Sequence, residues 1–185
     1  MEIEVKARLK DKNGVEKKLI ALGCSFSVPK TQDDTVWTAM VGSLKTFLSN
    51  DAFFRIRIQN CSKVILTAKR PKTKTGQASL VKHEYEVVVD SADEARGILK
   101  LMGLHEAVQV VKVRRTAKYK EYVICLDEVE KLGDFIEIEK FGEKESAQKT
   151  QNEMLGLLQE LGIPPEDVVK KGYDIVMLEE NPLLK

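Results

Sequence analysis

The chain has 185 residues, of which 43% are hydrophobic and 32% are charged, and its formal net charge is +1. This length suits one packed domain over residues 1–185, and the composition excludes an intrinsically disordered chain. The charge gives no indication of a nucleic-acid or membrane partner. The widely spaced cysteines favour reduced thiols. We find no signal peptide and no apolar run of the roughly 18 residues that a membrane helix needs. We therefore expect a soluble, cytoplasmic protein.

Charged and apolar residues alternate over several segments, which is typical of half-buried strands. The strands expected on this basis are residues 2–9, 53–59, 63–70, 82–89, 108–115, 118–127 and 134–141. Helical spacing predicts helices over residues 14–23, 145–161 and 173–180, and a fourth to about Met102 that begins with a capping box of Ser91 and Glu94. Short connections near 59–63 and 115–118 favour antiparallel pairing, and polar residues 72–80 predict a loop. The expected class is α+β.

Like charges recur at alternate positions of these strands. The rows are Glu2/Glu4/Lys6, Arg55/Arg57, Glu84/Glu86, Lys112/Arg114 and Glu137/Glu139, and Lys69 and Asp127 stand singly on two further strands. Alternate side chains of a strand project from one face, so each row points together. A single row is also what the solvated face of an antiparallel sheet shows. The charges of a row are mostly of one sign, the sign differs between strands, and the opposite face of each strand is apolar. These features favour a closed antiparallel barrel with charges inside and helices packed outside.

A charged interior has to be nearly neutral, since buried unpaired charge is costly. The acidic and basic members of these rows almost balance, whereas a nucleic-acid groove would be one-sidedly basic. Arg and Lys suit phosphate oxygens, and carboxylates suit Mg²⁺ or Mn²⁺. No Gly-rich phosphate loop is present. The rows therefore predict a polyphosphate bound by side chains together with divalent metal.

The same motifs resemble the CYTH family, which joins class IV adenylyl cyclases with thiamine triphosphatases. Its ExExK motif corresponds to Glu2–Lys6, and the likeness continues in order along the chain. The further matching segments are Gln32-Asp33-Asp34, Phe54-Arg55-Ile56-Arg57, Leu66–Pro71, Glu84-Tyr85-Glu86, Val111–Arg115 and Leu126–Glu139. The resemblance implies an antiparallel barrel called a triphosphate tunnel, with charged residues projecting inward.

Site roles follow from the resemblance, position by position. It implies that phosphates are bound by Arg55, Arg57, Lys69, Lys112 and Arg114, and that Mg²⁺ or Mn²⁺ is bound by Glu2, Glu4, Glu137 and Glu139. The catalytic candidates are Lys6, for activating the attacking group, and Asp127; Glu84 and Glu86 are further site candidates. Residues 35–49 and the lysine pair Lys170 and Lys171 have no assigned role, and a homodimer is expected because such barrels often pair.

Three functions fit these features. The first is a class IV adenylyl cyclase that converts ATP to cyclic AMP and pyrophosphate; the uninterrupted Leu132–Glu139 block resembles the cyclase branch of the family. The second is a triphosphatase that releases orthophosphate from tripolyphosphate or thiamine triphosphate. The third is a non-catalytic polyphosphate or nucleotide sensor. The full set of candidate metal-binding carboxylates argues against a sensor.

Overall fold

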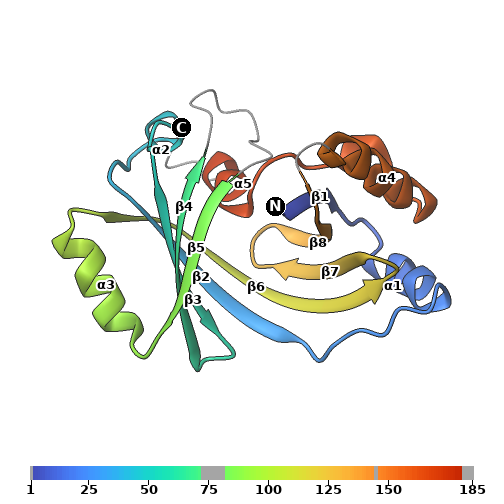
Figure 1. Ribbon diagram of the computed structural model, residues 1–185, viewed down its shortest axis with the longest axis horizontal. Coiled ribbons are helices and arrows are strands. Elements are labelled where there is room, and N and C mark those ends of the chain that lie inside the picture. The colour runs from blue at the N-terminus through green and yellow to red at the C-terminus, as the bar shows by residue number, and fades with distance from the viewer. Residues whose placement is uncertain (1, 72–81, 144–145, 181–185) are drawn as a thin grey trace. The chain divides into compact units, whose positions relative to one another are not determined.

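Eight antiparallel strands form the framework of the computed structural model, which describes residues 2–71, 82–143 and 146–180 without the side chains of Glu2, Pro71, Lys82 and His83. Hydrogen-bonded neighbours follow the order β1-β8-β7-β6-β2-β3-β4-β5 (Figure 1). The strands are β1 (Glu2–Arg8), β2 (Lys30–Thr38), β3 (Phe53–Gln59), β4 (Lys63–Pro71), β5 (Lys82–Val89), β6 (His105–Tyr119), β7 (Tyr122–Val129) and β8 (Gly133–Phe141). Strands β1 and β5 stand at the two ends of this order, so the closed barrel stays a prediction.

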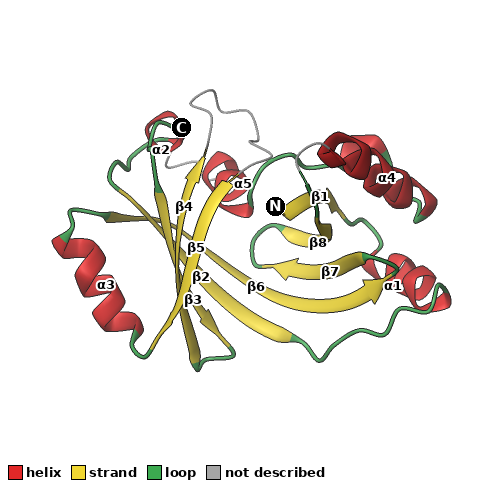
Figure 2. Ribbon diagram, viewed as in Figure 1, coloured by secondary structure: helices red, strands yellow, loops and turns green. Residues whose placement is uncertain are grey.

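Helices make up about half of the remaining described residues (Figure 2). They are α1 (Lys12–Ala21), α2 (Leu44–Leu48), α3 (Ala92–Leu101), α4 (Ala147–Glu160) and α5 (Tyr173–Glu180), with a 3-10 turn at Pro165–Asp167. The Ser91 side chain accepts a hydrogen bond from the Glu94 amide, as the predicted capping box requires. No helix of the described ranges is long and apolar enough to cross a membrane. The α+β antiparallel class is confirmed.

By its internal contacts the chain divides into two units. Unit 1 comprises Met1–Lys30 and Lys112–Lys170, and unit 2 comprises Thr31–Val111 and Lys171–Lys185. The single domain over residues 1–185 stays a prediction. The expected loop at 72–80 lies outside the described residues.

In unit 1, α1 and α4 cover the apolar face of the strands. Ile3, Val5 and Ala7 of β1 are buried with Ile136 and Ile138 of β8. The helices contribute their own apolar stripes to this core: Val15 and Leu19 from α1, and Met154, Leu157 and Leu158 from α4. The apolar faces opposite the charge rows are therefore covered by helices, as expected.

In unit 2, α3 takes the corresponding position. Ala95 and Leu99 pack with Ile56 of β3 and Val64 of β4. Trp37 is 1% exposed and packs in the same core. The side chains of Arg55 and Arg57 leave β3 on the other face, because they alternate with Ile56.

Two sequence predictions about the strands are wrong. The turn expected at 115–118 does not exist, because β6 runs to Tyr119 and the chain reverses at Lys120 and Glu121 before β7 begins. Arg115 projects from the face opposite Arg114, where its guanidinium donates to Glu16 of α1 at 2.6 Å and lies 5.2 Å from the Phe26 ring. Second, residues 30–38 form strand β2, which the alternation of charged and apolar residues does not predict.

Candidate functional site

The charged face of unit 1 is built around the pairing of β1 with β8. Lys6 stands opposite Glu137, and Glu4 stands opposite Glu139, in the antiparallel register. The Lys6 ammonium lies 2.8 Å from a Glu137 oxygen, and both side chains are less than a tenth exposed. Register therefore places residues of two predicted rows beside one another on one face.

Arg114 of β6 connects this pair to the neighbouring strands. Its Nε and one terminal nitrogen donate to the two oxygens of Asp127 on β7, at 2.7 and 2.6 Å. The guanidinium also contacts Glu137, and it reaches a Glu139 oxygen at 3.3 Å. Lys112 lies 3.6 Å from Asp127, whose side chain is fully buried. Asp127 thus holds two of the predicted phosphate-binding cations.

These buried charges are stabilised by their partners. Burial alone would raise the pKa of the Glu137 carboxyl, but the charges of Lys6 and Arg114 outweigh it and hold that pKa below its ordinary value. Burial alone would lower the pKa of Arg114, whereas Asp127 and Glu137 raise it above its ordinary value. Glu137 and Arg114 therefore both remain charged near neutral pH.

Glu4 and Glu139 form the part of this face that suits a cation. Two carboxylates directly opposite one another on adjacent strands repel, which disfavours the pairing unless positive charge lies nearby. Carboxylate oxygens are the ligands that Mg²⁺ and Mn²⁺ prefer. Over the described residues no preformed group of three His, Cys, Asp or Glu side chains is present, and the Glu2 side chain lies outside the described part. The donor chemistry fits a divalent metal at this pair, with Glu137 two residues away on the same face.

Unit 2 carries a second charged face, in which Arg57 is paired with Asp34 of β2. The two residues are register partners, and the guanidinium donates to both carboxylate oxygens at 2.6 and 2.7 Å. Their side chains are 14% and 8% exposed. This bidentate pair resembles that of Arg114 with Asp127, so in each unit an Asp fixes an Arg across neighbouring strands.

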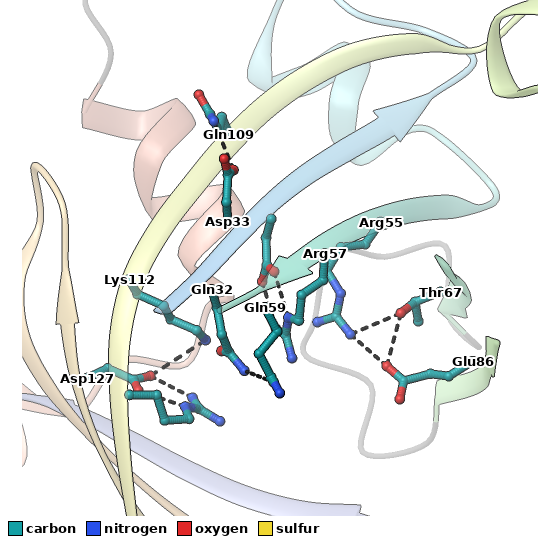
Figure 3. A network of polar contacts seen from close by, with 12 residues as sticks. Gln32, Asp33, Arg55, Arg57, Gln59, Thr67, Glu86, Gln109, Lys112 and Asp127 are labelled. Atoms are coloured by element: carbon teal, nitrogen blue, oxygen red, sulfur yellow. Dashed lines mark hydrogen bonds and ion pairs between the residues drawn. The ribbon is translucent and has the colours of Figure 1, made fainter. Parts of the chain in front are cut away.

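Two further predicted phosphate-binding cations of unit 2, Arg55 and Lys69, lie on the same face, toward β4 and β5. Arg55 donates to the Thr67 hydroxyl at 3.1 Å and to Glu86 at 2.8 Å, and Thr67 in turn donates to Glu86 at 3.0 Å (Figure 3). Lys69 lies 2.9 Å from Glu84. The Nε of Arg55 is buried and has no hydrogen-bond partner among the described residues.

The sequence model of the CYTH domain matches residues 1–173. The chain belongs to the CYTH family. It is 30% identical over 174 residues to the Methanocaldococcus jannaschii protein named "Putative adenylate cyclase MJ0240", an alignment that covers 94% of this chain and 96% of that one.

Solved structures show the same CYTH fold. The PH1819 protein of Pyrococcus horikoshii is 29% identical with a TM-score of 0.80, and the match covers 98% of this chain and all of that one. The Hippeastrum protein named "Putative adenylyl cyclase HpAC1", described as having a dominant triphosphatase activity, is 22% identical with a TM-score of 0.62; the match covers 99% of each chain. At this lower identity the likeness to HpAC1 shows the fold alone.

The structure brings most of the predicted CYTH site residues into these two networks. In unit 1 it joins Lys6, Lys112, Arg114, Asp127, Glu137 and Glu139, with Glu4 opposite Glu139; in unit 2 it joins Arg55 to Glu86, and Lys69 to Glu84. The roles assigned to these residues stay predictions. Of the two lysines without a role, Lys171 pairs with Glu179 of α5.

Sequence reasoning missed Asp34, Thr67 and the amide pair of Gln32 with Gln59. Each lies beside a predicted cation only because of strand register, which the sequence alone does not give. The available indication was that Gln32 and Asp34 are two residues apart, as on one face of a strand.

Proposed function

We propose that this chain is a divalent-metal-dependent enzyme that acts on a triphosphate, and that its reaction converts ATP to cyclic AMP and pyrophosphate. The observation that carries the proposal is that six cations of this CYTH chain lie on strand faces and are each paired with a carboxylate: Lys6, Lys112 and Arg114 in unit 1, and Arg55, Arg57 and Lys69 in unit 2. Such preorganised cations bind phosphate oxygens without first having to be ordered.

Phosphate-binding candidates are assigned separately in each unit. Arg55, Arg57 and Lys69 would serve in unit 2, and Lys112 and Arg114 in unit 1. The arginines offer planar donor forks and the lysines offer compact charges. Asp34 and Asp127 act as positioning residues in this proposal, because both oxygens of each carboxylate accept hydrogen bonds from an arginine.

Metal binding is assigned to Glu4, Glu139 and Glu137, together with Glu2. A divalent ion held by these carboxylates would neutralise charge on the phosphate and favour deprotonation of the attacking hydroxyl. Lys6 is paired with Glu137 at 2.8 Å, which suits an ammonium that stays charged and neutralises charge on the reacting phosphate. The catalytic role of Lys6 is therefore proposed as electrostatic.

In the cyclase reaction, the ribose 3′-oxygen of ATP forms a bond to the α-phosphorus. The bond from that phosphorus to the oxygen bridging to the β-phosphate breaks, pyrophosphate leaves, and the hydroxyl proton passes to solvent. The name of the relative that is 30% identical over almost the whole chain supports this choice of reaction.

A triphosphatase is the second candidate. The described charged residues account for phosphate and metal binding, and these are equally needed when water attacks a terminal phosphorus. The activity stated for the Hippeastrum neighbour is of this kind.

Purified protein should be supplied with Mg²⁺ or Mn²⁺ and, separately, ATP, tripolyphosphate and thiamine triphosphate. Cyclic AMP with pyrophosphate supports the cyclase, and orthophosphate supports the triphosphatase. Binding without turnover of any substrate would favour a sensor and refute the enzyme assignment. Gel filtration of the same sample tests the predicted homodimer, and the cytoplasmic location likewise stays a prediction.

A further inference from the structure

Two amide side chains stand next to the Asp34–Arg57 pair on the charged face of unit 2. Gln32 of β2 and Gln59 of β3 are register partners, and the Gln32 amide nitrogen lies 3.3 Å from the Gln59 amide oxygen (Figure 3). Gln32 is only 5% exposed, and its own amide oxygen is buried with no hydrogen-bond partner among the described residues. A buried acceptor of this kind destabilises a fold unless a donor reaches it.

The amide pair leaves a donor beside an acceptor. Each carboxamide carries one acceptor oxygen and one donor nitrogen, and the contact between them uses one of each. Among the described residues the Gln32 oxygen has no partner, and the Gln59 nitrogen is not used in this contact. Turning both amides over would exchange these roles and would still leave one donor and one acceptor. The pair is therefore complementary to a ligand edge that also carries a donor next to an acceptor.

The other end of the same face is cationic. Gln59, Arg57 and Arg55 occupy alternate positions of β3, with side chains roughly 7 Å apart along the strand. The buried Nε of Arg55 is a donor without a partner among the described residues, which suits an anionic oxygen. Unit 2 thus offers amides at one end of the row and phosphate-binding donors at the other.

We propose that Gln32 and Gln59 bind the ring of an organic triphosphate through an amino group next to a ring nitrogen, while Arg55 and Arg57 hold its phosphates. This inference rests on the proposed function and narrows its substrate class. Glutamine amides bind the adenine edge in this bidentate way. The aminopyrimidine of thiamine carries the same chemistry, whereas tripolyphosphate has no ring.

The test compares Gln32→Met with Gln109→Met. Methionine keeps the length of the side chain and removes its polar atoms. Gln109 is an exposed amide of the same unit that donates to Asp33 at 2.8 Å, so it provides a matched control (Figure 3). The assay measures kcat/KM for ATP, thiamine triphosphate and tripolyphosphate with each protein.

We expect Gln32→Met to lower kcat/KM by roughly 5- to 150-fold for the organic substrate that the wild type prefers. Turnover of tripolyphosphate should stay within about twofold, and Gln109→Met should match the wild type for every substrate. Loss confined to ATP or to thiamine triphosphate identifies which ring is bound. Denaturant unfolding checks that Gln32→Met is folded. If Gln32→Met does not fold, Gln59→Met is used in its place.

Two results would overturn the inference while leaving the proposed function intact. One is an equal loss for tripolyphosphate and the organic substrates, which a purely structural amide pair would produce. The other is a wild-type preference for tripolyphosphate over both organic substrates. By contrast, the proposed function is refuted if the wild type turns over no triphosphate. In that case the ring contact is tested by binding alone, through titration of ATP and of tripolyphosphate into Gln32→Met and Gln109→Met.

Discussion

Replacing Asp34 with Asn should destabilise unit 2 through Arg57. The substitution keeps the size of the side chain and one acceptor oxygen but removes the negative charge and one of the two hydrogen bonds, at 2.6 and 2.7 Å. A hydrogen bond to a charged group contributes about 1.5–3 kcal/mol, and removing a whole partner of a buried ion pair costs about 3–5 kcal/mol. The Arg57 and Asp34 side chains are 14% and 8% exposed, and Asn keeps one of the two hydrogen bonds. We therefore expect Asp34→Asn to lower the free energy of unfolding by about 1.5–3 kcal/mol.

Asp33→Asn is the matched control. Asp33 is the preceding residue of β2, projects from the opposite face and accepts one hydrogen bond from the neutral Gln109, which Asn can still accept. Its free energy of unfolding should stay within about 0.5 kcal/mol of the wild type. Denaturant unfolding of both variants provides the measurement.

A double-mutant cycle with Arg57→Ala tests whether the loss arises from this pair. If it does, Asp34→Asn should cost little once Arg57 is gone, and the coupling energy should approach the single-variant effect. A coupling energy below about 0.5 kcal/mol would refute the idea that Asp34 holds Arg57.

Three further outcomes are expected. Lys120→Gly should raise the free energy of unfolding by up to about 1 kcal/mol, because Lys120 has φ 53°, a left-handed conformation that glycine adopts without strain; a loss would contradict the turn at this position. Under native conditions a thiol reagent should modify exposed Cys61 well before Cys24 and Cys125, because burial raises the pKa of both these thiols; equal rates would contradict the burial. The pKa of Glu137 is lower in the folded protein, so its stabilisation is complete above the unfolded-state value of about 4.3 and is lost as pH falls through the folded value. As the pH falls from the unfolded-state value toward the folded value, the metal-free wild type should therefore lose stability more steeply than Glu137→Gln, and equal slopes would refute the ion pair.

Strands with clean alternation could be predicted from the sequence. The bounds expected for β3, β5 and α5 match the structure. Strand β2 was missed because Asp33 and Asp34 are adjacent, so charge appears on both of its faces. Asp33 is satisfied by Gln109 and Asp34 by Arg57, and neither partner is near in sequence.

The misplaced turn has a related cause. Arg114 and Arg115 interrupt the alternation of β6, and an arginine on the helix-covered face looks like the end of a strand. Glu16 of α1 compensates that charge, which only the tertiary structure reveals. The actual turn contains Lys120 in a left-handed conformation without the glycine or asparagine that would have indicated it.

For the candidate site, the sequence predicted the charged rows, and the structure added their partners. Alternation shows which residues of one strand share a face, but it does not show which strands are neighbours or in what register. The cross-strand pairs of Glu4 with Glu139 and of Asp34 with Arg57 therefore could not be derived from the sequence.

The most direct test of the central claim is a phosphorus NMR time course of the purified protein with Mg²⁺ and ATP or tripolyphosphate. It should be repeated with a chelator, with Glu139→Gln, and with Glu130→Gln, an exposed turn residue of the same unit, as a control. The account predicts metal-dependent conversion, to pyrophosphate and cyclic AMP from ATP or to orthophosphate from tripolyphosphate, that is lost in Glu139→Gln and kept in Glu130→Gln. Unchanged spectra for the wild type with metal, or full activity of Glu139→Gln, would contradict it.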